Sequence, residues 1–156
     1  MFSLSSRWRV ERSIEIDASP DAVYHLIASF KDGWSRWNPF VEPHHELSYS
    51  GAASGVGSIL HWKDGRRGGS LTMREADPRA GVVYDMEFEG MKLTGRIAFA
   101  RGTPLRVTLS DEGDCGRNPL LWIMSFFADR VMGPTLAKGL ETMKAKAEAR
   151  SAAPSR

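Results

Sequence analysis

Few side chains in this chain combine a reactive group with a setting that could make it react. His61 stands beside Trp62 in an apolar stretch, and Tyr84 lies on the apolar side of a later alternating stretch. Either residue could serve as a general acid or base if an apolar pocket shifted its pKa and a second polar group stood beside it. Against this, a histidine in a strand is usually a surface or a hydrogen-bonded core residue.

Arg12 is the other polar candidate, because it interrupts the apolar side of the first alternating stretch. A buried guanidinium needs an anion or a carboxylate as its partner, so Arg12 could hold the acidic head group of a ligand. Alternatively, its long side chain extends from the strand into water. We expect Arg12 or His61 to be the polar member of a binding site.

Other reactive centres are not favoured. His44 and His45 are neighbours on a predicted strand, so their rings should point to opposite faces and make a poor metal chelate. Cys115 is the single cysteine, which rules out an internal disulfide and a cysteine-based metal cluster. It lies in a predicted polar loop, residues 111–118, whose carboxylates raise the pKa of a thiol. The sequence predicts no metal and no other cofactor.

The composition indicates one ordinary globular domain. The 156 residues suffice for a core, and we expect a single domain over residues 1–150 and a disordered tail over 151–156. A net charge of +2, from 21 basic and 19 acidic residues, argues against a nucleic-acid partner, which would need a clustered basic face. No apolar window is long enough for a membrane span, and the first residues lack the apolar stretch of a signal peptide. We therefore expect a cytoplasmic protein.

The alternation of apolar and polar residues predicts a strand at residues 8–16. Ser19, Pro20 and Asp21 then give the cap, first position and acidic first turn of a helix. One or two helical turns follow at residues 34–40. Later strands are expected at residues 45–49, 58–63, 70–75, 82–88, 93–99 and 105–109. Their short connections indicate an antiparallel meander.

A long helix should close the chain over residues 119–149, with Pro134 bending or breaking it. Residues 120–128 are apolar nearly all round, which is typical of a buried helix. They could instead line a pocket mouth and touch a membrane transiently, or contact a second copy in a homodimer. This order of elements predicts an α+β fold: one strand, short helices, a run of strands and a long helix. In such a fold a curved sheet wraps around the last helix, and the two enclose a pocket.

Several motifs resemble those of the polyketide cyclase/dehydrase group of the START-related (SRPBCC) superfamily, typified by the major birch pollen allergen. They are Ala18-Ser19-Pro20 with Val23, Trp34-x-x-Trp37-Asn38-Pro39, Gly55-x-Gly57 followed by Trp62, Asn118-Pro119-Leu120, and Met132-Gly133 with Lys138-Gly139-Leu140 and Met143-Lys144. The resemblance covers residues 8–148. It implies a helix-grip fold, a seven-stranded antiparallel sheet around a long C-terminal helix with two short helices after the first strand and an apolar cavity. Members bind lipids, hormones or polyketides, and a few are cyclases.

We therefore predict non-covalent binding of a hydrophobic small molecule, a lipid or a polyketide-like compound, in the cavity between sheet and helix. The expected contact residues are Arg12, Trp37, His61, Trp62, Tyr84, Met86, Phe88, Phe99, Trp122 and Phe126. We expect Trp62 to point inward with Leu60, and Trp34 and Trp37 to plug the gap between helix and sheet. The alternatives are a cyclase or dehydratase with Tyr84 or His61 as acid or base, and a protein-interaction module.

Overall fold

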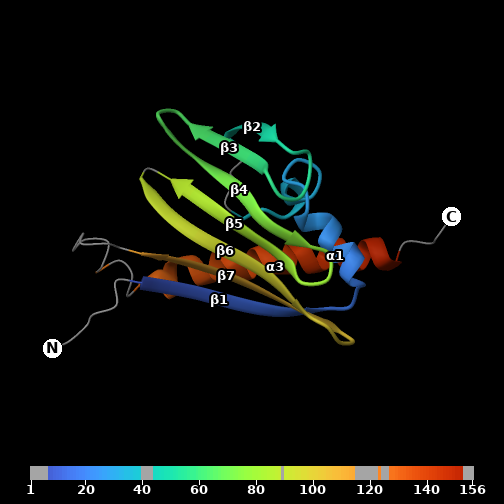
Figure 1. The fold of residues 1–156 in the computed structure, drawn as a ribbon. Coiled ribbons are helices and arrows are strands. Elements are labelled where there is room, and N and C mark those ends of the chain that lie inside the picture. Colours follow the sequence, from blue (N-terminus) through green and yellow to red (C-terminus); the bar gives the residue numbers. More distant parts are fainter. Residues whose placement is uncertain (1–6, 40–43, 89, 115–122, 124–126, 153–156) are drawn as a thin grey trace.

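The computed structural model describes residues 7–39, 44–88, 90–114, 123 and 127–152. One strand comes first, followed by a short helix, a turn of 3₁₀-helix, six more strands and a long helix (Figure 1). The elements are β1 (Arg7–Ile16), α1 (Pro20–Ile27), η1 (Trp34–Arg36), β2 (Glu46–Gly51), β3 (Ser58–Asp64), β4 (Arg67–Asp77), β5 (Gly81–Phe88), β6 (Met91–Ala100), β7 (Leu105–Asp114) and α3 (Ala128–Ala152).

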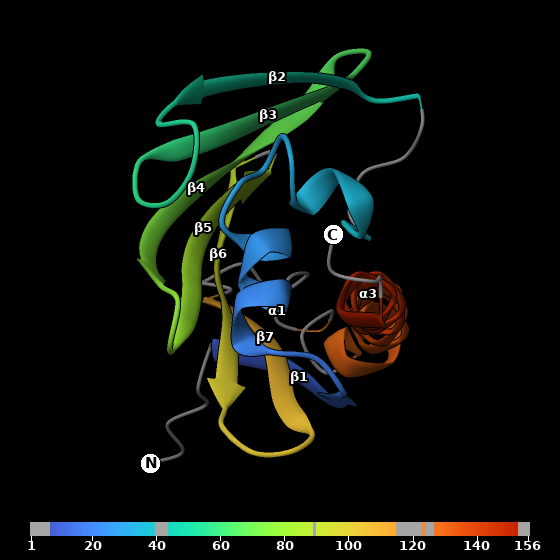
Figure 2. The same cartoon turned by 90° about the vertical axis from the view of Figure 1, so that its right-hand side faces the viewer.

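All seven strands form one antiparallel sheet in the order β1-β7-β6-β5-β4-β3-β2. Strands β2 to β7 each pair with their neighbours in the chain, and β1 adds to the free edge of β7. Viewed end-on, the sheet curves, and α3, α1 and η1 lie on its concave side (Figure 2). The prediction of an α+β helix-grip fold is therefore confirmed.

We call the concave face of the sheet the inner face. Leu105, Val107 and Leu109 on β7 are buried at every second position, as expected where successive side chains point to opposite faces. Leu136 and Met143 of α3 are fully buried in the same apolar cluster. Their spacing of seven residues, two helical turns, places both on the side of α3 that faces the sheet.

The start of α1 follows its sequence signals. The Ser19 Oγ accepts a hydrogen bond from the backbone N–H of Ala22 at 3.2 Å, which satisfies one of the unpaired donors of the first turn. Pro20 occupies the first helical position, where its missing N–H costs nothing, and Asp21 lies in the positive first turn.

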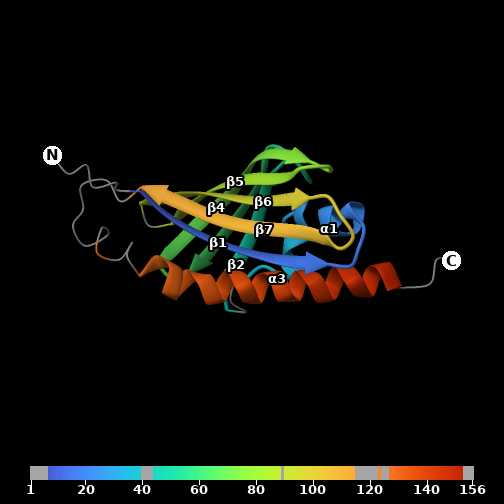
Figure 3. The same ribbon diagram turned by 90° about the horizontal axis from the view of Figure 1, so that it is seen from below.

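Helix α3 runs along β1 and β7 beneath the sheet (Figure 3). It continues through Pro134 from Ala128 to Ala152, so the expected break is not found. Ile123 and Phe127 are 50% and 51% exposed, so the apolar stretch of residues 120–128 is not covered on all sides where it is described. Among the described helices, none has both the length and the apolar character needed to cross a membrane.

Two local predictions were wrong. Strand β7 extends to Asp114, so residues 111–114 belong to the sheet and not to a polar loop. The alternation that begins at Leu105 simply continues through a polar stretch. His44 and His45 precede β2, which begins at Glu46, so the rule that neighbouring strand residues face apart does not apply to them.

Candidate functional site

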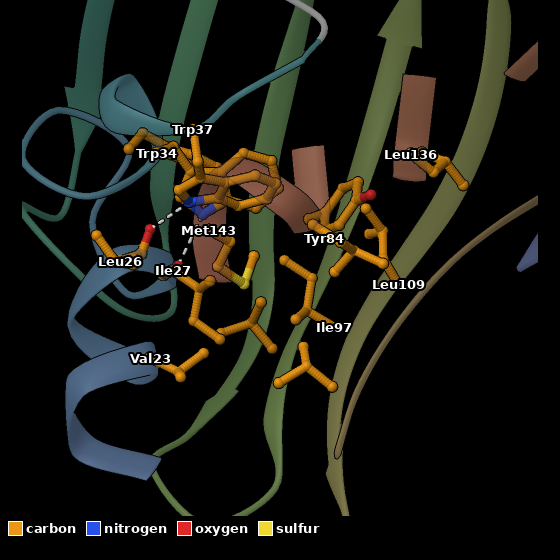
Figure 4. Close-up of a cluster of buried hydrophobic side chains, with 14 of the residues drawn as sticks. Val23, Leu26, Ile27, Trp34, Trp37, Tyr84, Ile97, Leu109, Leu136 and Met143 are labelled. Carbon is orange, nitrogen blue, oxygen red and sulfur yellow. Dashed lines mark hydrogen bonds between the residues drawn. The ribbon is translucent and has the colours of Figure 1, made fainter. Parts of the chain in front are cut away.

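Two tryptophan rings fill the inner face beside α1 and η1. Trp34 and Trp37 are buried, and their ring centroids lie 4.7 Å apart. The Trp34 indole N–H donates to the Ile27 carbonyl oxygen at 2.8 Å, and that of Trp37 donates to the Leu26 carbonyl oxygen at 2.7 Å (Figure 4). These two rings therefore plug the gap between helix and sheet, as predicted. The one polar atom of the Trp37 side chain already has a partner, which favours a structural role for this residue.

Tyr84 lies against this plug. Its ring meets Trp34 edge-on, with centroids 5.0 Å apart and an interplanar angle of 87°. Ile97, Leu109 and Leu136 lie near Tyr84 in the close-up, and each is fully buried (Figure 4). Side chains thus pack this half of the space between sheet and helix.

Tyr84 and Asp111 form a buried polar pair on the inner face. The Tyr84 hydroxyl donates to Oδ1 of Asp111 at 2.5 Å, and both residues are fully buried. Gly95 stands between them in the register of the sheet, and a Cβ there would lie 2.0 Å from the Tyr84 Cζ. The tyrosine ring therefore crosses β6 over Gly95, in space that any other residue would occupy. Within the described part of the chain, Oδ2 of Asp111 has no hydrogen-bond partner.

Burial controls the protonation of this pair. It raises the pKa of Asp111 from 3.8 to about 6, and the hydrogen bond from Tyr84 offsets only part of that rise. Burial and the neighbouring carboxylate raise the pKa of Tyr84 well above 10, so its hydroxyl keeps its proton and donates. Asp111 can therefore exchange a proton close to neutral pH, which suits a general acid or base.

Beyond the pair, the inner face continues with apolar side chains that are only half-buried. We call this region the apolar end; it comprises Trp8 of β1, Phe88 of β5 and Leu93 of β6, together with Met132 of α3. Leu93 pairs with Gly113, and Gly113 pairs with Trp8. This row lies two residues further along the strands than Gly95 and Asp111, which corresponds to about 7 Å. Figure 3 shows that the same end of the sheet meets the beginning of α3.

Trp62 and Met86 belong to the inner face, as predicted. Trp62 is 7% exposed and shares this face with Leu60, which confirms the choice between the two sides of β3. Its ring is stacked with that of Phe88, with centroids 6.3 Å apart, across Gly69. A groove of about 560 Å³, lined in part by Trp62 and Gly69, opens at this corner of the sheet.

Phe99 and His61 lie away from this group. Phe99 is six residues from Leu93 along β6, about 20 Å, at the end of the sheet opposite the apolar end. His61 is exposed, and its Nε2 lies 3.0 Å from the Ser50 hydroxyl. Because Leu60 and Trp62 point inward, His61 points outward. The structure thus does not bring these two predicted contact residues to the inner-face site.

Arg12 forms an ion pair with a carboxylate of the same chain. Its two terminal nitrogens lie 2.8 Å and 3.0 Å from the two carboxylate oxygens of Asp129 on α3. This two-point contact holds the pKa of Asp129 below its usual value and raises that of Arg12. The pair links β1 to the helix, so the guanidinium does not require a ligand anion.

Trp122 and Phe126, the last two predicted contact residues, lie outside the described residues. Asp111 is the residue that the sequence analysis missed, since it was assigned to a loop. The available signal was its position: Leu105, Val107, Leu109 and Asp111 all have the same parity, so an extended strand would have placed the carboxylate on the inner face.

Comparison with known proteins now identifies the family. The family model for "Polyketide cyclase / dehydrase and lipid transport" matches residues 7–148. The chain belongs to this family. No curated protein matches it.

Several solved structures share this fold. The NMR structure of the KanY protein shares 18% identity, with a TM-score of 0.66 over 90% of this chain and 97% of that one. The di-domain ARO/CYC protein StfQ from the steffimycin biosynthetic pathway shares 13% identity, with a TM-score of 0.69 over 94% of this chain and 52% of StfQ. A point mutant of norcoclaurine synthase from Thalictrum flavum, in complex with a transition-state analogue, shares 16% identity, with a TM-score of 0.64 over 92% and 96%. These likenesses establish the fold.

Proposed function

We propose that this protein binds a hydrophobic small molecule against the apolar end, and that Oδ2 of Asp111 anchors the ligand. The observation that carries the proposal is a buried oxygen, Oδ2 of Asp111, that has no hydrogen-bond partner among the described residues, on a face whose next row carries half-buried apolar side chains. An unpaired buried carboxylate oxygen is costly, so a ligand that donates a hydrogen bond to it recovers that cost. The preferred ligand is therefore an apolar ring system that carries a hydroxyl or N–H group.

The apolar contact supplies most of the affinity. Removing about 300 Å² of apolar surface from water stabilises a complex by about 7 kcal/mol before the costs of association. A hydrogen bond to a charged group adds about 1.5–3 kcal/mol. Asp111 thus fixes the orientation of the ligand, and apolar side chains such as Phe88 and Leu93 supply most of the binding affinity.

Naphthol is a suitable probe, because it is a flat ring system with one hydroxyl, and methoxynaphthalene is its analogue without the donor. Titration of the full chain, followed by tryptophan fluorescence, should give tighter binding of naphthol than of methoxynaphthalene. The preference should disappear in Asp111→Asn, which presents an N–H in place of an acceptor. Equal binding of both probes to the wild-type protein would refute the anchor.

Phe88→Ala tests the location of the ligand. Loss of this half-buried ring should weaken naphthol binding roughly tenfold, because about 1.4 kcal/mol of contact is lost. Glu87→Ala, on the neighbouring residue, which points to the other face, is the matched control and should bind normally. Equal affinity of the two variants would place the ligand elsewhere.

Cyclase or dehydratase activity is the second candidate, favoured by the pKa of about 6 at Asp111. As a carboxylate, Asp111 would take a proton from a carbon between two carbonyl groups, and the resulting enolate would attack a further carbonyl carbon. The protonated acid would then return the proton to the new alkoxide, and loss of water would follow. Support comes from the family and from the ARO/CYC proteins of the same fold.

A poly-β-keto thioester tests this activity. Mass spectrometry should show a product that has lost water with the wild-type protein, and its rate should fall in Asp111→Asn and in Tyr84→Phe. Normal naphthol binding together with an unchanged thioester would retain the binding function and reject the catalytic one.

A further inference from the structure

Two histidines and an aspartate converge at one corner of the sheet. His44 and His45 come directly before β2, and Asp64 is the last residue of β3. The Nε2 atoms of His44 and His45 lie 3.3 Å and 3.8 Å from the same Asp64 oxygen, Oδ2. One ligand atom from each of the three residues can be chosen so that all lie within 4.8 Å of one another.

The sheet itself creates this convergence. Glu46 pairs with Lys63, so the next position outward places His45 opposite Asp64. His44 is one residue further from the strand, in a turn, and is free of the alternation that would turn its ring away. The two imidazole rings meet edge-on with centroids 4.6 Å apart, and both present Nε2 to the carboxylate.

We propose that His44, His45 and Asp64 bind a divalent zinc ion. Zinc takes imidazole nitrogens and carboxylate oxygens at about 2.0–2.2 Å in a tetrahedron, which places neighbouring ligand atoms about 3.3–3.6 Å apart. The shorter of the two contacts here already has this spacing, and the longer needs a shift of only a few tenths of an ångström. Three protein ligands leave the fourth position for water, the arrangement of an open zinc site.

The three residues lie at the rim of the sheet and differ in their exposure. Asp64 lies two residues beyond Trp62 on β3 and has the same parity, so it extends the inner-face side of that strand to the rim of the sheet. The three side chains differ in exposure. That of His45 is only 11% exposed, whereas those of His44 and Asp64 are 60% and 51% exposed. One ligand is therefore held by packing, and the other two remain accessible to an incoming ion.

The test is titration of the untagged full chain, freed of metal with a chelator, with zinc by calorimetry and with cobalt by absorption spectroscopy. We expect one zinc ion per chain and a cobalt spectrum of four-coordinate type. His44→Ala and Asp64→Asn should each weaken zinc binding more than about tenfold, because losing even an outer partner of a metal site costs that much. Both residues are exposed, and circular dichroism checks that the variants fold.

His61→Ala is the matched control, since it removes an exposed histidine from the same strand β3 and should bind zinc normally. Absence of saturable binding, or equal affinity of His44→Ala, Asp64→Asn and the wild-type protein, would overturn the proposal. A loss in His61→Ala equal to that in the site variants would also overturn it, because it would indicate scattered binding to surface histidines.

Discussion

Replacing Asp111 by asparagine should change how stability depends on pH. In the folded protein Asp111 keeps its proton up to about pH 6, whereas a carboxyl without this burial loses it near 3.8. Raising the pH between these values therefore favours the unfolded state, which releases the proton more readily. Integrated between about pH 4.5 and about pH 7.5, this linkage lowers the free energy of unfolding by about 2 kcal/mol. Asparagine does not titrate, so Asp111→Asn lacks this loss.

Urea unfolding at both pH values, followed by the fluorescence of the buried tryptophans, measures the effect. The stability of Asp111→Asn minus that of the wild-type protein should rise by about 2 kcal/mol from the lower to the higher pH. Taking this difference cancels the other ionisable groups, and the unpaired asparagine amide adds only a constant. A flat or falling difference for Asp111→Asn would refute the burial argument.

Two further substitutions test neighbouring contacts. Gly95→Ala places a Cβ 2.0 Å from the Tyr84 ring and should lower the free energy of unfolding by about 1–3 kcal/mol. The comparison variant Gly102→Ala meets the Pro104 carbonyl oxygen at 3.3 Å and should lose less stability in the same urea assay, and equal losses in both would contradict the crossing of the ring over β6. Arg12→Met should leave naphthol affinity unchanged, because Asp129 already holds the guanidinium, and weaker fluorescence-detected binding would restore Arg12 as a ligand anchor.

The fold could be predicted from the sequence because its signals are local. Alternation identified the strands, and Ser19 and Pro20 marked the start of α1. Short connections between strands then left little choice of pairing. Chain order and patterning thus determine the meander and the helix it holds.

The candidate site was harder to predict, because it depends on pairing between strands distant in sequence. Asp111 follows Ser110 and precedes Glu112 and Gly113, a composition typical of loops. The pairing of Asp111 with Val10 on one side and with Gly95 on the other shows that the strand continues there. Polar residues in a buried strand oppose the hydrophobic pattern, so pattern alone assigns them to the surface. The same limit applied to His44 and His45, where one residue in the position of the strand boundary removed the reason to expect that the two rings face apart.

Two glycines explain how the inner face carries both a polar pair and an aromatic stack. Gly95 lies under the Tyr84 ring, and a Cβ at Gly69 would come within 2.3 Å of the Trp62 ring. In each case the glycine on the intervening strand leaves room for a large ring to lie across that strand, toward a partner two strands away. The Tyr84 ring reaches a polar partner, Asp111, and the Trp62 ring reaches an aromatic partner, Phe88. Tyr84 and Phe88 stand four residues apart on β5, about 13 Å, so the two glycines let one sheet carry a polar contact and an aromatic contact at separate places on its inner face.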